Sequence, residues 1–358
     1  MRLPMDRHPE RCGRWSAMAT ISPIRKIWAV WLRFYFVIAP YLRLGNRRPG
    51  PLERLVELSM IGFARWSLVP RLPWPYLLFE TNFDNESDRY LEVFALIIPG
   101  GLQINWLGAY GFPNPRRVGR FQQYVNDRKL PIHHYYSAYP NASTKSIRTA
   151  LELQRQVGAF QVPQSPEEFR GAYRRLLERV QAIRNPGARE TPTRQTGSLT
   201  FLIPIEAGGR GEVGVGIELL RDAPTPVPDV THFARWTIID QLEVAPGQPQ
   251  NPNHYLLFSA WFDGPPRDFL KALYGTLGPR VNAIWRRCGF RGPDAEAFAR
   301  YLEGFEVRPG FKFHAYDGVT VAEVRAALEL AERFGSFTAS SQGLDATALR
   351  AAWVATFP

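Results

Sequence analysis

The chain has 358 residues, of which 45% are hydrophobic and 13% aromatic, a composition that supports packed cores and excludes an intrinsically disordered protein. With only two cysteines, a disulfide framework and a cysteine-rich zinc site are excluded, and a reducing, cytoplasmic location is expected. The net charge of +11 lies mainly at the N-terminus, because residues 1–54 hold 11 Lys and Arg residues against 3 acidic ones. The rest of the chain is nearly neutral, so we do not expect it to bind nucleic acid.

The first predicted element is an apolar helix within residues 24–44. Its most apolar part, residues 27–42, includes Arg33 and Pro40 and is shorter than the roughly 20 residues that a membrane-spanning helix needs. Tryptophan and tyrosine within this part, with basic residues on both sides, are typical of a helix at a membrane surface. We therefore expect residues 24–44 to give peripheral membrane association. Packing on the body of the protein, in an oligomer or on a partner protein is the alternative.

The rest of the chain is a duplication. Phe63–Trp66 returns as Phe233–Trp236 with an offset of 170 residues, and Tyr76–Phe79 returns as Tyr255–Phe258 with an offset of 179. An ordered series of matches at nearly constant spacing, in a repeat this long, indicates two similar domains. Further matches at offsets of 179 or 177 residues are Trp106 with Trp285, Phe121 with Phe298, Tyr124 with Tyr301, Tyr139 with Tyr316, and Glu152 with Glu329.

The second copy predicts a ferredoxin-like unit. Asp263 follows a predicted strand and is placed to cap the helix after it. The order strand, helix, two strands, helix and strand, followed by a closing helix, defines this unit. The predicted strands are 199–206, 231–239, 255–262 and 311–316, and the predicted helices are 210–221, 266–287 and 320–334.

The first copy predicts the same order without its first strand, in whose place the apolar segment and a helix at 51–60 stand. Ser165–Glu168 is a helix-start signal after this copy, and it predicts a basic helix to Arg184 followed by a linker at 185–197. The first copy's predicted strands are 63–69, 76–83 and 133–139, and its helices are near 87–106 and 143–157. The predicted domains are a docking tail at 1–50, a first repeat at 51–160, a helix and linker at 161–197, a second repeat at 198–340 and a C-terminal tail at 341–358.

Two tandem ferredoxin-like units resemble the dimeric α+β barrel superfamily, over about residues 60–338. The resemblance implies an α+β fold in which the two repeats pack sheet against sheet as an intramolecular barrel, with helices outside. It also implies a hydrophobic or haem-like ligand and an oxidoreductase activity, because the superfamily includes small monooxygenases, dye-decolourising peroxidases and chlorite dismutases. The GxxDG signature associated with the dye-decolourising peroxidases is absent.

The alternation of side chains along each strand separates a polar and aromatic face from an apolar face. We expect helices to cover the apolar face and the polar face to line the barrel interior. The candidate lining residues are Arg65, Glu80, Asn82, Ser137, Tyr139, Arg235, Lys312, His314 and Tyr316.

His314 is the leading candidate for a haem or metal ligand, because histidine is a usual ligand and the first copy has Ser137 at the equivalent position. Arg65 and Arg235 are the candidate catalytic residues, since a guanidinium can polarise a peroxide or hold a carboxylate. The alternative is that these side chains form internal hydrogen bonds and ion pairs. His232, Tyr139 and Tyr316 are further candidates for cofactor binding, with His133 and His134 behind them.

Gly209–Gly214 matches the GxGxxG pattern, but no acidic residue ends a strand about 20 positions later, so a dinucleotide site is not expected. Residues 77–83 lack the aromatic pattern of an RNA-recognition strand. The sequence thus predicts a membrane-peripheral α+β barrel that binds a hydrophobic or haem-like ligand, as a peroxidase-like oxidoreductase. The alternative is a non-catalytic scaffold or accessory subunit that docks through its N-terminal helix.

Overall fold

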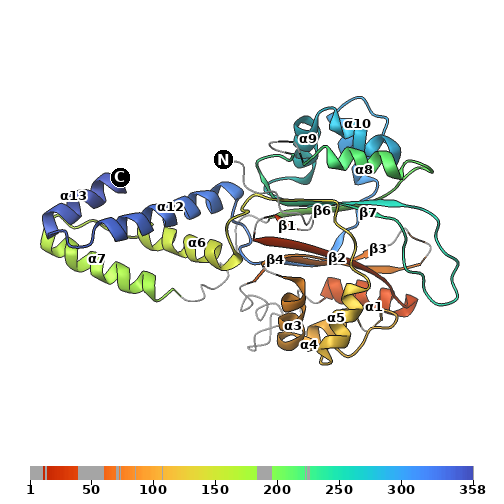
Figure 1. Cartoon of the computed structure of the whole chain (residues 1–358), viewed down its shortest axis with the longest axis horizontal. Helices are drawn as coiled ribbons and strands as arrows, with labels where there is room; N and C mark the ends of the chain where they lie inside the picture. Colours follow the sequence, from red (N-terminus) through yellow and green to blue (C-terminus); the bar gives the residue numbers. More distant parts are fainter. Residues whose placement is uncertain are drawn as a thin grey trace.

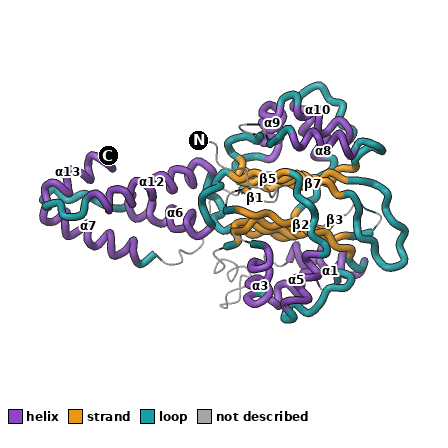
Figure 2. The backbone as a smooth tube through the Cα atoms, in the orientation of Figure 1, coloured by secondary structure: helices purple, strands orange, loops and turns teal. Residues whose placement is uncertain are grey.

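The computed structural model describes residues 11–38, 60–183 and 196–357, except for positions 13, 70, 71, 73, 85, 107, 222, 224 and 225. Two antiparallel sheets stack face to face, and helices cover the outer side of each sheet (Figure 1; Figure 2). A lobe of helices extends from one end of this body. The fold is therefore α+β, as the sequence predicts.

The first repeat contains the complete βαββαβ order. A two-residue strand, β1 (Arg11–Cys12), pairs with the repeat's first strand. The elements of the repeat are β2 (Trp15–Pro23), α1 (Lys26–Ile38), β3 (Ile61–Val69), β4 (Tyr76–Asp84), α3 (Ser87–Ile97), α4 (Pro99–Trp106), α5 (Val118–Asn126), β5 (His134–Ser137) and α6 (Thr144–Gly158).

The second repeat has the same order, and one helix separates the repeats while another ends the chain. The separating helix is α7 (Pro166–Gln181). The other elements are β6 (Gly197–Pro204), α8 (Arg210–Glu218), β7 (Thr231–Ile239), β8 (Tyr255–Phe262), α9 (Pro266–Leu277), α10 (Arg280–Trp285), η2 (Arg286–Cys288), α11 (Ala295–Glu303), β9 (Pro309–His314), α12 (Val321–Ser340) and α13 (Ala346–Thr356).

The two repeats exchange their last strands. One sheet has the order β1-β2-β4-β3-β9, and the other has the order β5-β7-β8-β6. Thus β9 of the second repeat pairs with β3, aligning His314 with Phe63. In the same way β5 of the first repeat pairs with β7, aligning Tyr135 with Arg235. Each sheet is completed by a strand from the other half of the chain.

The expectation that the first repeat lacks its first strand is wrong. That strand is β2, which pairs with β4 along its whole length and is buried throughout. Small residues of low strand preference, such as Ala17 and Ala19, hide it in the sequence. The apolar segment that follows forms α1, the counterpart of α8, so residues 15–23 belong to the first sheet. The other domain boundaries stay predictions, and the predicted 51–60 helix and most of the 185–197 linker lie outside the described residues.

Two predicted helices are interrupted. The helix predicted at 266–287 divides into α9 and α10 at Gly278, whose positive φ of 53° ends α9. The helix predicted near 87–106 divides into α3 and α4 around Ile98. Asp263 does not cap the helix after it, because its carboxylate accepts a hydrogen bond from the backbone N–H of Val321, at the start of α12.

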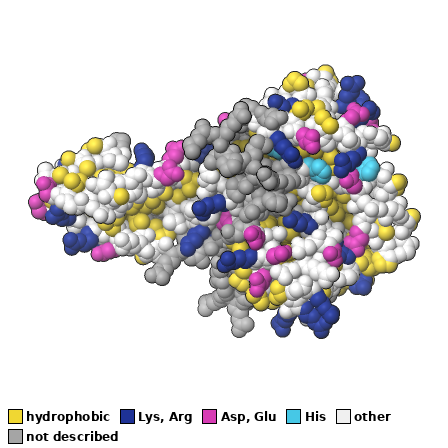
Figure 3. All heavy atoms as spheres, in the orientation of Figure 1, with side chains coloured by type: hydrophobic (Ala, Val, Ile, Leu, Met, Phe, Trp, Pro, Cys, Tyr) yellow, Lys and Arg dark blue, Asp and Glu magenta, His cyan; other side chains and the backbone are white. Residues whose placement is uncertain are grey.

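The lobe consists of α6, α7, α12 and α13. It has a core of its own, in which Phe169, Tyr173, Phe337 and Trp353 pack together. Hydrophobic side chains gather along this lobe in the space-filling view (Figure 3). Within the predicted C-terminal tail at 341–358, Ala346–Thr356 forms α13, a helix that packs in the lobe.

Candidate functional site

The space between the sheets is divided into three zones. At one end, aliphatic and tyrosine side chains from both sheets, including Ile21, Leu78, Leu202 and Leu257, form a closed apolar cluster. At the other end, aromatic rings and histidines meet. Between these two zones lies a band of buried polar side chains, which includes Arg65, Ser67, Glu80, Asn82, Thr200, Arg235 and Thr237.

A buried charge cluster occupies the middle band. Arg65 Nε donates to Glu80 Oε2 at 2.6 Å, and the hydroxyl of Thr200 donates to the same oxygen at 2.9 Å. Arg235 comes from the opposite sheet, and its Nε lies 3.9 Å from Glu80 Oε1. These three charged residues are between 0% and 2% exposed. Two guanidiniums therefore face one carboxylate, which leaves one excess positive charge between the sheets.

The charges keep Glu80 ionised. Burial alone would raise the pKa of the Glu80 carboxyl, but the guanidiniums of Arg65 and Arg235 lower it to about 2. Burial lowers the pKa of Arg235, and the charge of Glu80 opposes this effect. At neutral pH the cluster therefore holds two cations and one anion.

The two arginines differ in how their donors are used. Arg235 Nη1 donates to the Met18 carbonyl at 2.8 Å, and Nη2 donates to Asn82 Oδ1 at 3.1 Å. Nη1 and Nη2 of Arg65 are buried and have no hydrogen-bond partner in the described part of the chain. The Arg65 guanidinium carbon lies 5.4 Å from the centroid of the Trp261 ring. Arg65 thus has donors to offer to a further group, whereas Arg235 is held by the protein.

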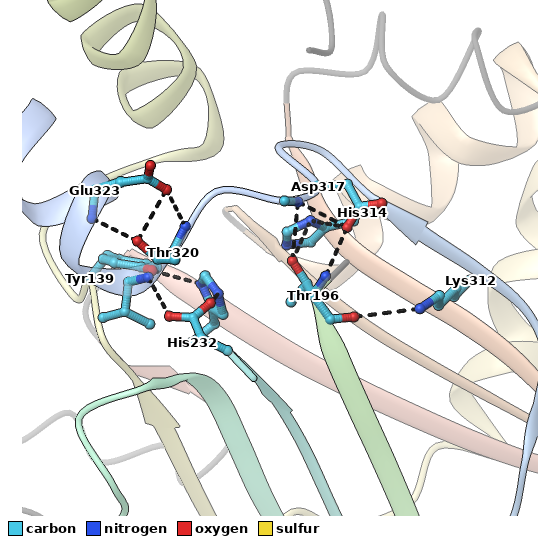
Figure 4. Close-up of polar contacts among 11 residues, drawn as sticks. Tyr139, Thr196, His232, Lys312, His314, Asp317, Thr320 and Glu323 are labelled. Atoms are coloured by element: carbon cyan, nitrogen blue, oxygen red, sulfur yellow. Dashed lines mark hydrogen bonds and ion pairs between the residues drawn. The ribbon is translucent and has the colours of Figure 1, made fainter. Parts of the chain in front are cut away.

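A hydrogen-bonded chain joins Tyr139, His232 and Asp263 at the aromatic end (Figure 4). The Tyr139 hydroxyl lies 2.7 Å from His232 Nδ1, and His232 Nε2 lies 2.9 Å from Asp263 Oδ1. Nε2 thus pairs with the carboxylate and Nδ1 pairs with the Tyr139 hydroxyl. Both nitrogens of His232 are therefore occupied, and His232 could bind a metal only by losing one of these bonds.

His314 has one ring nitrogen engaged. Its Nδ1 lies 3.4 Å from the hydroxyl of Thr196 and 3.6 Å from Asp317 Oδ1 (Figure 4). Its Nε2 is buried and has no hydrogen-bond partner among the described residues. Burial lowers the pKa of His314 to about 4, so the ring is neutral at pH 7 with its Nδ1 proton facing Asp317. Nε2 is then left with a lone pair that can accept a hydrogen bond.

The surroundings of His314 do not fit a haem. The centroid of the Phe63 ring lies 3.8 Å from that of His314, and the rings of Tyr316, His232 and Trp261 lie at 4.9, 5.8 and 5.9 Å. A porphyrin on Nε2 would have to lie where these side chains pack. The described residues also contain no group of three or more His, Cys, Asp or Glu side chains that could hold a metal ion.

The structure brings some of the predicted site residues together and separates others. Arg65, Glu80, Asn82 and Arg235 form the central band, and the residues Tyr139, His232, His314 and Tyr316 gather at the aromatic end. Lys312 is exposed on the edge strand β9, where its Nζ lies 3.4 Å from the Thr196 carbonyl, so it does not line the interior.

Three other predicted positions have local roles. Ser137 accepts a hydrogen bond from the backbone N–H of Tyr139. His133 accepts one from the backbone N–H of Ile238, and the ring of His134 packs on Trp236, on the helix-covered face of β7. The sequence favoured a helix cap over acid–base work for Asp263 and gave no signal for Asp317, although both acidic residues contact a candidate histidine.

Comparisons with known proteins give a distant likeness only. No family model and no curated protein sequence matches the chain. A crystal structure of a putative monooxygenase from Fusobacterium nucleatum matches with 6% identity and a TM-score of 0.28, covering 85% of this chain and 96% of that one. One of a putative monooxygenase from Lactobacillus acidophilus matches with 7% identity and a TM-score of 0.25, covering 84% and 97%. A likeness at this level carries no argument about activity.

Proposed function

We propose that the protein binds a small organic anion with an aromatic or apolar body between its two sheets. The observation that carries the proposal is Arg65, a fully buried guanidinium with two donors that no described residue accepts. Leaving such donors unsatisfied in a protein interior costs about 1–3 kcal/mol, more for a charged group, so a ligand that accepts from them is favoured. A carboxylate matches the planar geometry of a guanidinium and would neutralise the excess charge of the cluster.

The neighbouring side chains favour an aromatic body for this ligand. Phe63, Phe233, Trp15 and Trp261 surround the aromatic end of the interior and contact one another through their rings. His314 Nε2 supplies one hydrogen-bond acceptor among them. A benzoate-like molecule therefore fits both features: its carboxylate can accept from Arg65, and its ring can pack on these aromatic side chains.

Benzoate is the probe that tests the proposal, with benzyl alcohol as its uncharged counterpart. We expect benzoate to raise the melting temperature of the wild-type protein and benzyl alcohol to raise it much less. Arg65→Gln should abolish the benzoate effect, and Arg155→Gln, which removes an exposed guanidinium, should retain it. Equal stabilisation by the two compounds, or an unchanged benzoate response in a folded Arg65→Gln protein, would refute the proposal.

The oxidoreductase activity that the sequence suggests stays a prediction, and haem is not part of the proposal because the residues around His314 do not fit it. The Tyr139–His232–Asp263 chain is the group best placed for proton transfer in any chemistry on the bound anion. An absorption spectrum of protein purified from its native host tests for a bound chromophore. The non-catalytic alternative predicts no absorption from a bound chromophore and no turnover, while the protein still binds the anion.

A further inference from the structure

Helix α1 has two apolar faces, and only one of them is buried. Ala29, Leu32 and Phe36 face the body of the protein. The opposite face is a stripe of four apolar residues at helical spacing, which we call the α1 stripe: Ile27, Val30, Trp31 and Phe34, with 77%, 68%, 39% and 66% of their surfaces exposed. Exposed apolar residues that follow one helix face in this way are characteristic of an interaction site.

Aromatic rings stack along the helix beside the stripe. The ring of Trp31 lies 5.2 Å from that of Trp28 and 5.0 Å from that of Tyr35, to which it is nearly parallel. Tryptophan and tyrosine have an apolar body and one polar atom, which suits the boundary between lipid headgroups and hydrocarbon. This row of aromatic side chains thus favours a membrane surface over a uniformly apolar partner.

The charges around the α1 stripe favour an anionic surface. Arg25, Lys26 and Arg33 are exposed and form no salt bridge with any described residue, and α1 contains no acidic residue. The counterpart helix α8 differs, because Arg210 pairs with Asp240 and Glu212 pairs with Arg287. Basic residues near an anionic membrane contribute favourably to binding. A dimer through the same stripe would bring these cations of two copies together without any acidic partner on α1, which is unfavourable.

We propose that the protein docks on an anionic lipid surface through the α1 stripe, with α1 lying in the plane of the membrane. No described helix is long and apolar enough to cross a bilayer, and α1 has 13 residues. Its buried face stays on the protein, so only the exposed face would enter the headgroup region. This docking is independent of the anion in the barrel interior, because the two use different residues.

Vesicle flotation with the full chain tests the proposal. We expect the protein to float with vesicles of phosphatidylcholine and phosphatidylglycerol, to float poorly with phosphatidylcholine alone, and to lose binding as salt rises. Deleting residues 1–50 is not a valid test, because it removes β2 from the first sheet. Substitutions on the exposed face leave the sheet intact.

The decisive variant is Ile27→Ser with Val30→Ser and Phe34→Ser, which should lower the vesicle partition coefficient by roughly tenfold or more. The matched control is Val215→Ser with Leu219→Ser, which removes exposed apolar residues in α8 and at its C-cap and should bind like the wild type. Wild-type protein that does not bind the anionic vesicles, or a folded α1 variant that binds them equally, would overturn the proposal. A wild-type dimer that the α1 variant dissociates in gel filtration would assign the stripe to a second copy instead and overturn it too.

Discussion

Asp84 and Asp263 are equivalent residues of the two repeats, but their environments differ. Each carboxylate accepts a hydrogen bond from the first turn of the last helix of its own repeat, through Thr144 and Val321. Asp263 also accepts from His232. The first repeat has Gly62 at the position of His232, and a Cβ there would lie 2.5 Å from the Trp15 ring. Asp84 Oδ1 therefore has no hydrogen-bond partner among the described residues.

This difference predicts a pH-dependent stability that Asp84 controls. Burial raises the pKa of Asp84 to about 7, although the Thr144 hydrogen bonds and Arg14 oppose the shift. A raised folded-state pKa means that the stability from protonated Asp84 is fully present below about 3.8 and is lost as the pH rises through about 7. Asp84→Asn keeps an acceptor for Thr144 and cannot ionise. We expect this variant to be more stable than the wild type at pH 8, by about 1–3 kcal/mol, and to show little difference near pH 4.

Urea denaturation of both proteins from pH 4 to pH 8 measures this effect. Asp263→Asn is the control. It disturbs the hydrogen bond to His232, so it should not show the increase in stability at pH 8 that is expected for Asp84→Asn. If the stability difference between Asp84→Asn and the wild type is the same at every pH, Asp84 does not titrate in this range.

At the level of elements, strands with a clear pattern could be predicted, and pairing partners could not. Phe233–Trp236 lies in a strand rich in β-branched and aromatic residues, and β7 is found where the sequence places it. The sequence does not reveal β2, since its alanines and serines are small and both of its faces are buried. Residues of the charge cluster could be predicted from strand alternation. The contact of Arg235 could not, because Arg235 meets Glu80 only through the stacking of two sheets, whereas Arg65 and Glu80 are paired on neighbouring strands of one sheet.

Helix α8 packs so closely on α10 that the contact restricts which residues α8 can contain. It contains Gly214 and Gly216, which weaken a helix by roughly 1 kcal/mol each relative to alanine. A Cβ on Gly216 would lie 2.5 Å from the backbone oxygen of Ala283 in α10, whereas one on Gly214 would make an ordinary contact at 3.8 Å with Ile238. The close approach of α8 to α10 therefore requires a glycine at position 216, two residues after the GxGxxG match ends.

The two glycines give opposite predictions. Gly216→Ala should push α8 away from α10 and lower the free energy of unfolding by about 1–3 kcal/mol. Gly214→Ala, two residues away in the same helix, should raise it by up to about 1 kcal/mol. Equilibrium denaturation measures both, and a stabilising Gly216→Ala would show that the helices can separate at little cost.

For the whole molecule, the exchange of β5 and β9 makes the two repeats dependent on each other. β9 closes the sheet of the first repeat, and β5 closes the sheet of the second. The lobe adds a further link, because α6 packs on α12, and α7 packs on α13. The buried charge cluster also contains one arginine from each half. A single half therefore leaves a sheet edge, a helix face and buried charges without their partners.

This dependence predicts that the halves fold only together. Residues 1–190 and 191–358, expressed as separate chains in one cell, should form a one-to-one complex with the far-ultraviolet circular dichroism of the intact protein. Each fragment alone should aggregate or lack a cooperative thermal transition, because it exposes an unpaired strand edge and half of the interior. The decisive comparison is between the fragments and the complex: a fragment that melts alone at the temperature of the complex would mean that each repeat closes its own sheet and that the exchange of β5 and β9 is not required for folding.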